Sequence, residues 1–214
     1  WADRIKLHMD VTIPHVLKTL QIDYENPVPA RAQLALVRTL EGVSRSLMIK
    51  RDPKLEAMMD KISAKIGELY KSGENKFCPV CAESPAFYYL ATGKKTAWLT
   101  AAEELAKITA KQYFDEKGKS IKEPPGHAGV GQSLISLYQA TGDKYYSDLA
   151  QKYMDARGTP ATGQRLWPKF AAQHLPVDKM NAPGGHAGSF GWFASALVDV
   201  GALTGDKKYG AAAQ

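Results

Sequence analysis

The sequence predicts an all-α protein made of helical hairpins, and three observations lead to this fold class. First, apolar residues recur three and four positions apart along most of the chain, as in Leu40, Val43 and Leu47, and this spacing places them on one face of a helix. Second, no stretch alternates apolar and polar residues as a strand does, although residues 10–13 suggest a short extended segment. Third, the turn sequence Thr-Gly-Asp-Lys occurs twice, at residues 141–144 and 204–207.

Tight turns divide the helical segments into four hairpins. Each turn carries a Gly that ends a helix or an Asp or Pro that begins one, and the turns lie at residues 51–53, 91–94, 140–143 and 203–206. The first helix of each hairpin is expected over roughly residues 31–49, 82–92, 128–141 and 188–204. The second helices are expected over roughly residues 53–71, 95–114 and 144–157, and from 207 onward.

Longer segments rich in Gly, Pro and polar residues separate the hairpins, at residues 71–80, 115–126 and 158–185. A repeat of about 50 to 60 residues, with its long loops always on the same side, is typical of an alpha/alpha toroid whose first helices form an inner ring. The first helices carry few charges, as in residues 84–90 and 190–194, which suits a buried ring. We therefore expect residues 1–214 to form a single helical-hairpin domain. Because four hairpins do not close a six-hairpin ring, we expect it to be an incomplete (α/α)6 barrel.

The composition is that of a globular protein, with 44% hydrophobic and 23% charged residues in a chain of 214. The net charge of +6 comes from lysines scattered over polar helix faces rather than from a basic cluster, so we expect no nucleic-acid partner. No apolar run approaches the ~18 residues of a membrane span, so we expect no membrane partner either. The first residues lack the regions of a signal peptide. We expect any export signal to have been removed, and we favour a periplasmic or extracellular location over a cytoplasmic one.

The two cysteines, Cys78 and Cys81, stand in a Cys-Pro-Val-Cys motif. A structural zinc site needs about four ligands, usually from a second such pair, so we expect this chain by itself to hold no metal and no cofactor. A c-type haem would need a histidine at Ala82. Three interpretations remain: a free thiol pair or local disulfide, which we favour, half of a metal site completed by residues outside the chain, and a redox dithiol.

The tetrapeptide Gly-His-Ala-Gly occurs at residues 126–129 and 185–188, each time at the start of a predicted first helix. The two histidines, His127 and His186, therefore lie at one structural level, and helix N-termini favour anions or oxygen-rich ligands. The alternative is that each histidine caps its own helix or donates to a loop carbonyl. By register, Cys81 and Glu83 occupy the same level at the second hairpin. Glu83 is the nearest carboxylate, although the helix dipole alone would also stabilise a glutamate there.

The longest loop contains Arg165 and Trp167. An aromatic ring that stacks on a sugar, beside a cation that donates to its hydroxyl groups, suits carbohydrate recognition. The alternative is that Trp167 anchors its loop to the core. We take His127, His186, Glu83, Arg165 and Trp167 as the candidate substrate-binding residues, and we assign no catalytic residue.

The chain resembles the amino-terminal part of the bacterial beta-L-arabinofuranosidase family, glycoside hydrolases with an alpha/alpha six-hairpin barrel. The motifs that carry this resemblance extend over most of the chain. They are Trp1 with residues 11–14, then residues 83–93, 125–127, 137–143, 146–158, 185–187 and 202–206.

The resemblance implies that His127 and His186 help to bind the sugar. It also implies that the cysteine nucleophile, the catalytic glutamate and the ligands of a zinc ion lie in a later part of the complete protein. Two departures are clear. Residues 77–81 replace the family's His-Glu-Leu-Tyr and Gly-His segment, which removes one expected sugar-binding histidine, and the family's Gln and Asp-Gly-Tyr segment is missing around residues 71–76.

The sequence thus favours a glycoside hydrolase, or a fragment of one, that acts on a carbohydrate substrate. One alternative is a sugar epimerase or unsaturated glycuronyl hydrolase on the same toroid, where a histidine or carboxylate would act as general acid and base. The other is a non-catalytic helical-hairpin module that binds a glycan or a protein.

Overall fold

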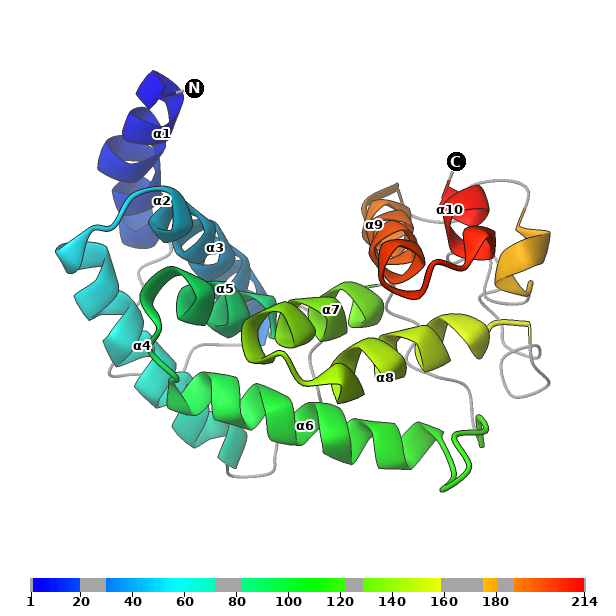
Figure 1. The fold of residues 1–214 in the computed structure, drawn as a ribbon. Helices are drawn as coiled ribbons and strands as arrows, with labels where there is room; N and C mark the ends of the chain where they lie inside the picture. Colours follow the sequence, from blue (N-terminus) through cyan, green and yellow to red (C-terminus); the bar gives the residue numbers. More distant parts are fainter. Residues whose placement is uncertain are drawn as a thin grey trace. The chain divides into compact units, whose positions relative to one another are not determined.

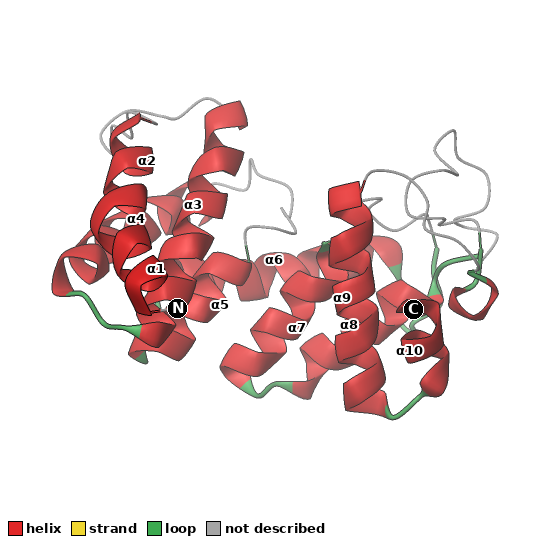
Figure 2. Ribbon diagram, turned by 90° about the horizontal axis from the view of Figure 1, so that it is seen from above, coloured by secondary structure: helices red, strands yellow, loops and turns green. Residues whose placement is uncertain are grey.

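The computed structural model describes residues 2–19, 30–71, 82–121, 129–158, 175–180 and 187–213. These residues form helices joined by turns and loops, with one isolated bridge between Phe114 and Ser120 and no strand within the described ranges (Figure 2). The chain divides into two compact units, Trp1–Glu103 and Glu104–Gln214, whose boundary falls inside one helix. The prediction of a single domain is not decided by this division and stays a prediction.

The first unit holds the amino-terminal helices and the first two predicted hairpins (Figure 1). A π-helical segment over His8–Thr12 joins the first two helices. The short extended segment expected at residues 10–13 is therefore wrong, because the backbone stays helical through Pro14, the second residue of α2. The helices are α1 (Ala2–Leu7), α2 (Ile13–Thr19), α3 (Ala30–Ile49), α4 (Pro53–Lys71), α5 (Glu83–Thr92) and the first part of α6 (Ala97–Tyr113).

The second unit holds the rest of α6 and the last two predicted hairpins. Its helices pack pairwise, α7 against α8, α9 against α10, and α7 against α9. A short 3-10 helix over Val177–Lys179 contacts α10. The helices are α7 (Val130–Thr141), α8 (Lys144–Asp155), α9 (Ala187–Thr204) and α10 (Lys207–Ala213).

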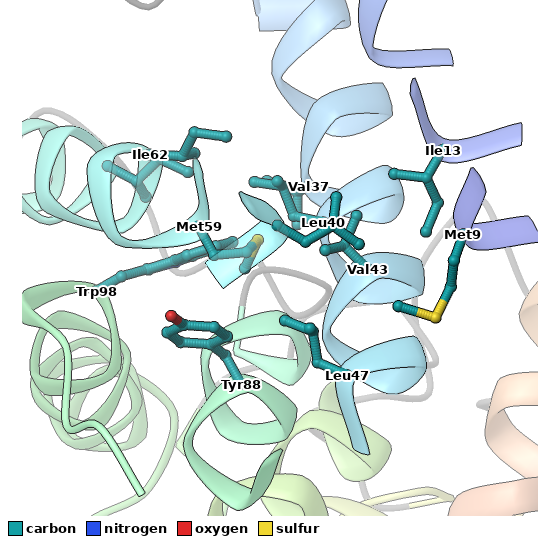
Figure 3. Packing of buried hydrophobic residues seen from close by; sticks show 12 residues of the cluster. Met9, Ile13, Val37, Leu40, Val43, Leu47, Met59, Ile62, Tyr88 and Trp98 are labelled. Atoms are coloured by element: carbon teal, nitrogen blue, oxygen red, sulfur yellow. The ribbon is translucent and has the colours of Figure 1, made fainter. Parts of the chain in front are cut away.

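The core of the first unit lies where α3 packs against α4 and α5. Leu40, Val43 and Leu47 are buried on one face of α3, as their spacing predicts. Tyr88 from α5 and Trp98 from α6 point into the same cluster, and Met9 approaches it from the amino-terminal helices (Figure 3). Full burial of such side chains stabilises the fold by about 1.5 to 3 kcal/mol each.

One turn design closes three of the hairpins. In the turn after α7, Gly142 has φ +71 and its amide donates to the Tyr138 carbonyl at 2.8 Å. The Thr141 hydroxyl donates to the Leu137 carbonyl at 2.7 Å and accepts from the Asp143 amide at 3.1 Å. The turns after α5 and α9 repeat each of these bonds, with Gly93 at φ +73 and Gly205 at φ +73. The repeated Thr-Gly sequence therefore encodes one local structure.

Candidate functional site

The structure describes one of the five predicted substrate-binding residues, Glu83. His127, His186, Arg165 and Trp167 lie outside the described residues, as do Cys78 and Cys81. The helix that follows each Gly-His-Ala-Gly copy is described, however. Gly129 is the residue before α7, and α9 begins at Ala187. Because α7 and α9 pack against each other, the first copy precedes one of two neighbouring helices and the second copy begins the other, as the sequence predicts. Whether both imidazoles share one concavity stays a prediction.

Glu83 is the first residue of α5, and only 4% of its surface is exposed. Its carboxylate oxygen Oε2 lies 3.6 Å from Nη2 of Arg45, which stands on α3. A buried carboxylate is costly unless it is paired, and this ion pair together with the start of α5 supplies the compensation. Glu83 therefore belongs to a contact between two first helices.

Arg45 is held on three sides. Its Nε donates to Oε1 of Glu41, one turn earlier on α3, at 2.9 Å. Its Nη2 faces Glu83, and its guanidinium carbon lies 3.9 Å from the centroid of the Phe87 ring. The Arg45 side chain nevertheless stays 46% exposed, against 20% for Glu41 and 6% for Glu83. The cluster thus presents a fixed, half-exposed cation above two carboxylates, with a formal charge of minus one.

The sequence positions this cluster through local packing. On α5, Ser84 donates to the Val37 carbonyl of α3 at 2.8 Å, which fixes the height of one helix along the other. Glu83 and Phe87 are one turn apart on α5, and Glu41 and Arg45 are one turn apart on α3, so each pair occupies one helix face. Sequence analysis did not select Arg45, because its two partners on α5 are remote in sequence and only the helix packing brings them together.

A second buried charge lies in the other unit. Arg157 is 8% exposed, and its guanidinium stacks on the Phe193 ring of α9 at 3.6 Å. Burial lowers the pKa of Arg157 to about 9. This contact ties the end of the α8 segment to α9 in the core, so we interpret it as structural.

The described ranges contain no group of three or more His, Cys, Asp and Glu side chains placed to hold a metal ion. The zinc ligands that the family resemblance implies are expected in a later part of the complete protein. Within the same ranges, no helix is long and apolar enough to cross a membrane.

Comparison with known sequences gives the family. The sequence model of the beta-L-arabinofuranosidase GH127 catalytic domain matches residues 82–214, which is more than half of the chain. The chain belongs to the GH127 beta-L-arabinofuranosidase family. The match includes α5 with Glu83 and both helices that follow the Gly-His-Ala-Gly copies.

Similar proteins agree with this GH127 assignment. The non-reducing end beta-L-arabinofuranosidase of Bifidobacterium longum subsp. longum is 25% identical over 212 residues, covering 78% of this chain and 32% of that protein. The match to the solved structure of a GH127 beta-arabinofuranosidase covers 99% of this chain and 40% of that protein's chain, with a TM-score of 0.77 and 24% identity. The match to the solved structure of a GH127 beta-L-arabinofuranosidase from Geobacillus stearothermophilus T6 covers 100% of this chain and 43% of that protein's chain, with a TM-score of 0.78 and 20% identity.

These comparisons confirm the predicted fold class. The chain is all-α, and its helical hairpins form part of an (α/α)6 barrel. It spans about a third of the length of its curated GH127 relative.

Proposed function

We propose that this GH127 chain forms part of the sugar-binding side of a beta-L-arabinofuranosidase-like glycoside hydrolase. The observation that carries the proposal is the family match over residues 82–214, together with the placement of the two Gly-His-Ala-Gly copies before the neighbouring helices α7 and α9. The curated relative is a non-reducing end beta-L-arabinofuranosidase, so the proposed substrate class is a terminal arabinofuranoside.

In this proposal His127 and His186 bind the sugar from the starts of α7 and α9. Imidazole N–H groups and ring nitrogens can donate to and accept from sugar hydroxyl groups. Arg165 and Trp167 are proposed to complete the site by donating to hydroxyl groups and stacking on the ring. Glu83 is proposed to take part from the start of α5. No residue of this chain is assigned to bond cleavage.

The test uses the full-length protein and its His127→Ala and His186→Ala variants. We expect kcat/KM on an aryl beta-L-arabinofuranoside to fall about 10- to 1000-fold in each, because hydrogen bonds that strengthen in the transition state carry several kcal/mol. Stability is expected to fall by at most ~1 to 2 kcal/mol, the size of a lost cap or hydrogen bond. His15→Ala, at an exposed position of α2, is the matched control and is expected to keep full activity.

The outcomes separate the alternative functions. Full activity in both histidine variants, or their global unfolding, would contradict the proposed binding site. Turnover of unsaturated uronides in place of arabinofuranosides would favour the glycuronyl hydrolase, and interconversion of free sugars would favour the epimerase. Sugar binding without turnover in the wild-type protein would favour a non-catalytic module.

A further inference from the structure

The inference concerns the face that α3 and α5 share, which is exposed at Arg45, Met48 and Leu90 and buried at Glu83 and Phe87. On α3 the face carries Glu41, Arg45 and Met48, at spacings of four and three residues. On α5 it carries Glu83, Phe87 and Leu90 at the same spacings. The contacts of Arg45 with Glu83 and Phe87 show that the two stripes adjoin.

This face changes character along the helices. Near the hairpin turns it is apolar and open, since Met48 is 49% exposed and Leu90 is 40% exposed. Toward the start of α5 it is polar, with the guanidinium of Arg45 flanked by two carboxylates. The polar end of this face thus lies toward the start of α5.

Arg45 combines exposure with restraint in a way that surface ion pairs rarely do. An exposed arginine ordinarily samples many rotamers, and pairing it with a carboxylate contributes little to stability. Here two carboxylates and one aromatic ring hold the guanidinium while nearly half of the side chain stays exposed. A guanidinium has five N–H donors in a fixed planar fork, more than these contacts use. The arrangement therefore offers preorganised donors at a defined position.

The charge of the cluster selects the class of ligand. Arg45 with Glu41 and Glu83 carries a formal charge of minus one, so a ligand carboxylate would meet two like charges beside one cation. A neutral sugar meets complementary groups, because the guanidinium donates to a hydroxyl oxygen and the partly exposed Glu41 accepts from a neighbouring hydroxyl. The charge of the Arg45 cluster thus favours neutral polyols over uronates as ligands.

We propose that Arg45 is a substrate-binding residue for a neutral sugar, with Glu41, Glu83 and Phe87 as the positioning residues that hold its guanidinium. The proposal rests on the proposed function and adds a residue and a charge preference to it. Glu83 then acts through Arg45, in keeping with its burial.

The experiment compares Arg45→Ala with Arg51→Ala in the full-length protein. Arg51 is the matched control because it has a similar exposure, 51%, pairs with a carboxylate, and contacts α5 through the Ala91 carbonyl at the opposite, turn end. KM and kcat are measured on an aryl beta-L-arabinofuranoside and on an aryl uronide, together with melting curves.

We expect Arg45→Ala to lower kcat/KM on the neutral sugar about 10- to 100-fold, the effect of losing a hydrogen bond from a charged group. Arg45→Lys should recover part of this loss, because the cation returns without its fork. Glu83→Gln and Phe87→Leu should raise KM several-fold, because each change weakens one contact that holds the Arg45 guanidinium while the guanidinium itself remains. Arg51→Ala should shift the melting temperature only.

Two results would overturn the proposal while leaving the proposed function intact. One is equal kcat/KM in the Arg45→Ala and Arg51→Ala proteins on an arabinofuranoside that the wild type cleaves. The other is a melting-temperature loss in Arg45→Ala that accounts for the activity loss, with Arg45→Lys giving no recovery. A wild-type protein that prefers the uronide would overturn the proposed function and this inference together.

Discussion

Single side chains join the elements of the first unit at its turn end, and Tyr88 is the clearest case. Its ring is fully buried in the core, while its hydroxyl donates to Asp60 at 2.7 Å. Asp60 also accepts from Lys94 at 2.7 Å, so one carboxylate of α4 receives donors from α5 and from the turn after it. Burial and the neighbouring Asp60 carboxylate raise the pKa of the Tyr88 hydroxyl. Tyr88 therefore stays a neutral donor across the working pH range.

Because of the contact with Asp60, the free energy of unfolding depends on pH in the acid range. Partial burial raises the pKa of Asp60, but the hydrogen bonds from Lys94 and Tyr88 outweigh it, and the pKa lies below its ordinary value of 3.8. The unfolded state therefore binds this proton more readily than the folded state does. The stabilisation by Asp60 is fully present above its ordinary pKa and is lost as the pH falls through the lower, folded-state pKa.

We therefore expect Asp60→Asn to be less stable than wild type at pH 7 and nearly equal to it at the lowest pH at which both stay folded. Urea denaturation at a series of pH values measures this difference. Asp148→Asn removes a carboxylate from an exposed pair on α8 and serves as the control, with little difference expected at any pH. A constant gap between Asp60→Asn and wild type would show that the ionised carboxylate is not the source of the effect.

At the residue scale, the sequence placed Glu83 at the start of α5 but did not reveal its partner. Helical register alone puts Glu83 at the start of α5, and the structure places it there. Its ion pair with Arg45 depends on how α3 and α5 pack, and the spacing of either helix by itself does not contain that information. Ile108 shows the same limit. It continues the helical spacing of Trp98, Ala101 and Leu105, which predicts a core position, yet 54% of its surface is exposed.

At the scale of elements, a glycine allows two helices to approach each other closely. A Cβ added to Gly67 of α4 would lie 2.7 Å from the Ala97 Cβ and 2.9 Å from the Ala97 carbonyl carbon, at the start of α6. Backbone atoms cannot move aside as the end of a long side chain can. The crossing of α4 and α6 therefore requires glycine at this position.

We expect Gly67→Ala to lower the free energy of unfolding by about 1 to 3 kcal/mol, the usual cost of overpacking, although alanine favours helix. Gly191→Ala provides the matched control, since Gly191 also lies inside a helix and an added Cβ there meets nothing within 4 Å. That variant should gain up to ~1 kcal/mol from helix propensity. Chemical denaturation of both proteins decides the matter, and equal stability changes would refute the packing argument.

Helix ends were predictable wherever local chemistry sets them. The predicted helices at 53–71, 82–92 and 188–204 compare with Pro53–Lys71, Glu83–Thr92 and Ala187–Thr204 in the structure. Pro, Asp and Gly act within a few residues of their own position, so the sequence contains the whole signal. The amino-terminal helices α1 and α2 were missed, because helices this short give little periodicity from which to predict them.

The Thr-Gly turns allow one prediction for three elements at once. Gly93, Gly142 and Gly205 share a left-handed backbone and open surroundings, so replacing any of them by Ala should cost the same, about 1 to 2 kcal/mol. Gly158→Ala should cost more, because Gly158 has φ +69 and an added Cβ would also meet Pro176 at 2.3 Å. Melting curves of the four variants give the ranking. Unequal costs among the first three would mean that the turns differ energetically despite their common geometry.

At the scale of the whole molecule, α6 is the covalent link between the two compact units. Its first residues belong to the first unit, where Trp98 joins the hydrophobic core, and its last turns belong to the second. Unfolding of one unit should therefore destabilise the other through α6. A helix that loses its tertiary packing along half of its length is no longer stabilised as a whole. We therefore expect the two units to unfold together, which is what the single-domain prediction requires.

The single-domain prediction can be checked by hydrogen exchange in the Gly67→Ala protein. If the chain unfolds as one body, the slowest amides of α7 should exchange faster by the same factor as those of α4, because both report global unfolding. Unchanged exchange in α7, with acceleration confined to Trp1–Glu103, would mean that the two units of this chain unfold separately. The Gly191→Ala protein is the comparison. Because it is expected to be more stable than wild type, the slowest amides of both helices should exchange more slowly in it.

The repeated turn also has a consequence for the time order of folding. All of its hydrogen bonds join residues no more than four positions apart in the sequence, as between Thr141 and Leu137. Contacts between residues so close in sequence form within about a microsecond or less. The packing of α3 on α5, in contrast, must wait until the whole of α4 and the segment after it has been synthesised. On the ribosome, each hairpin can therefore close as it emerges, and the chain assembles by adding preformed hairpins to those already made.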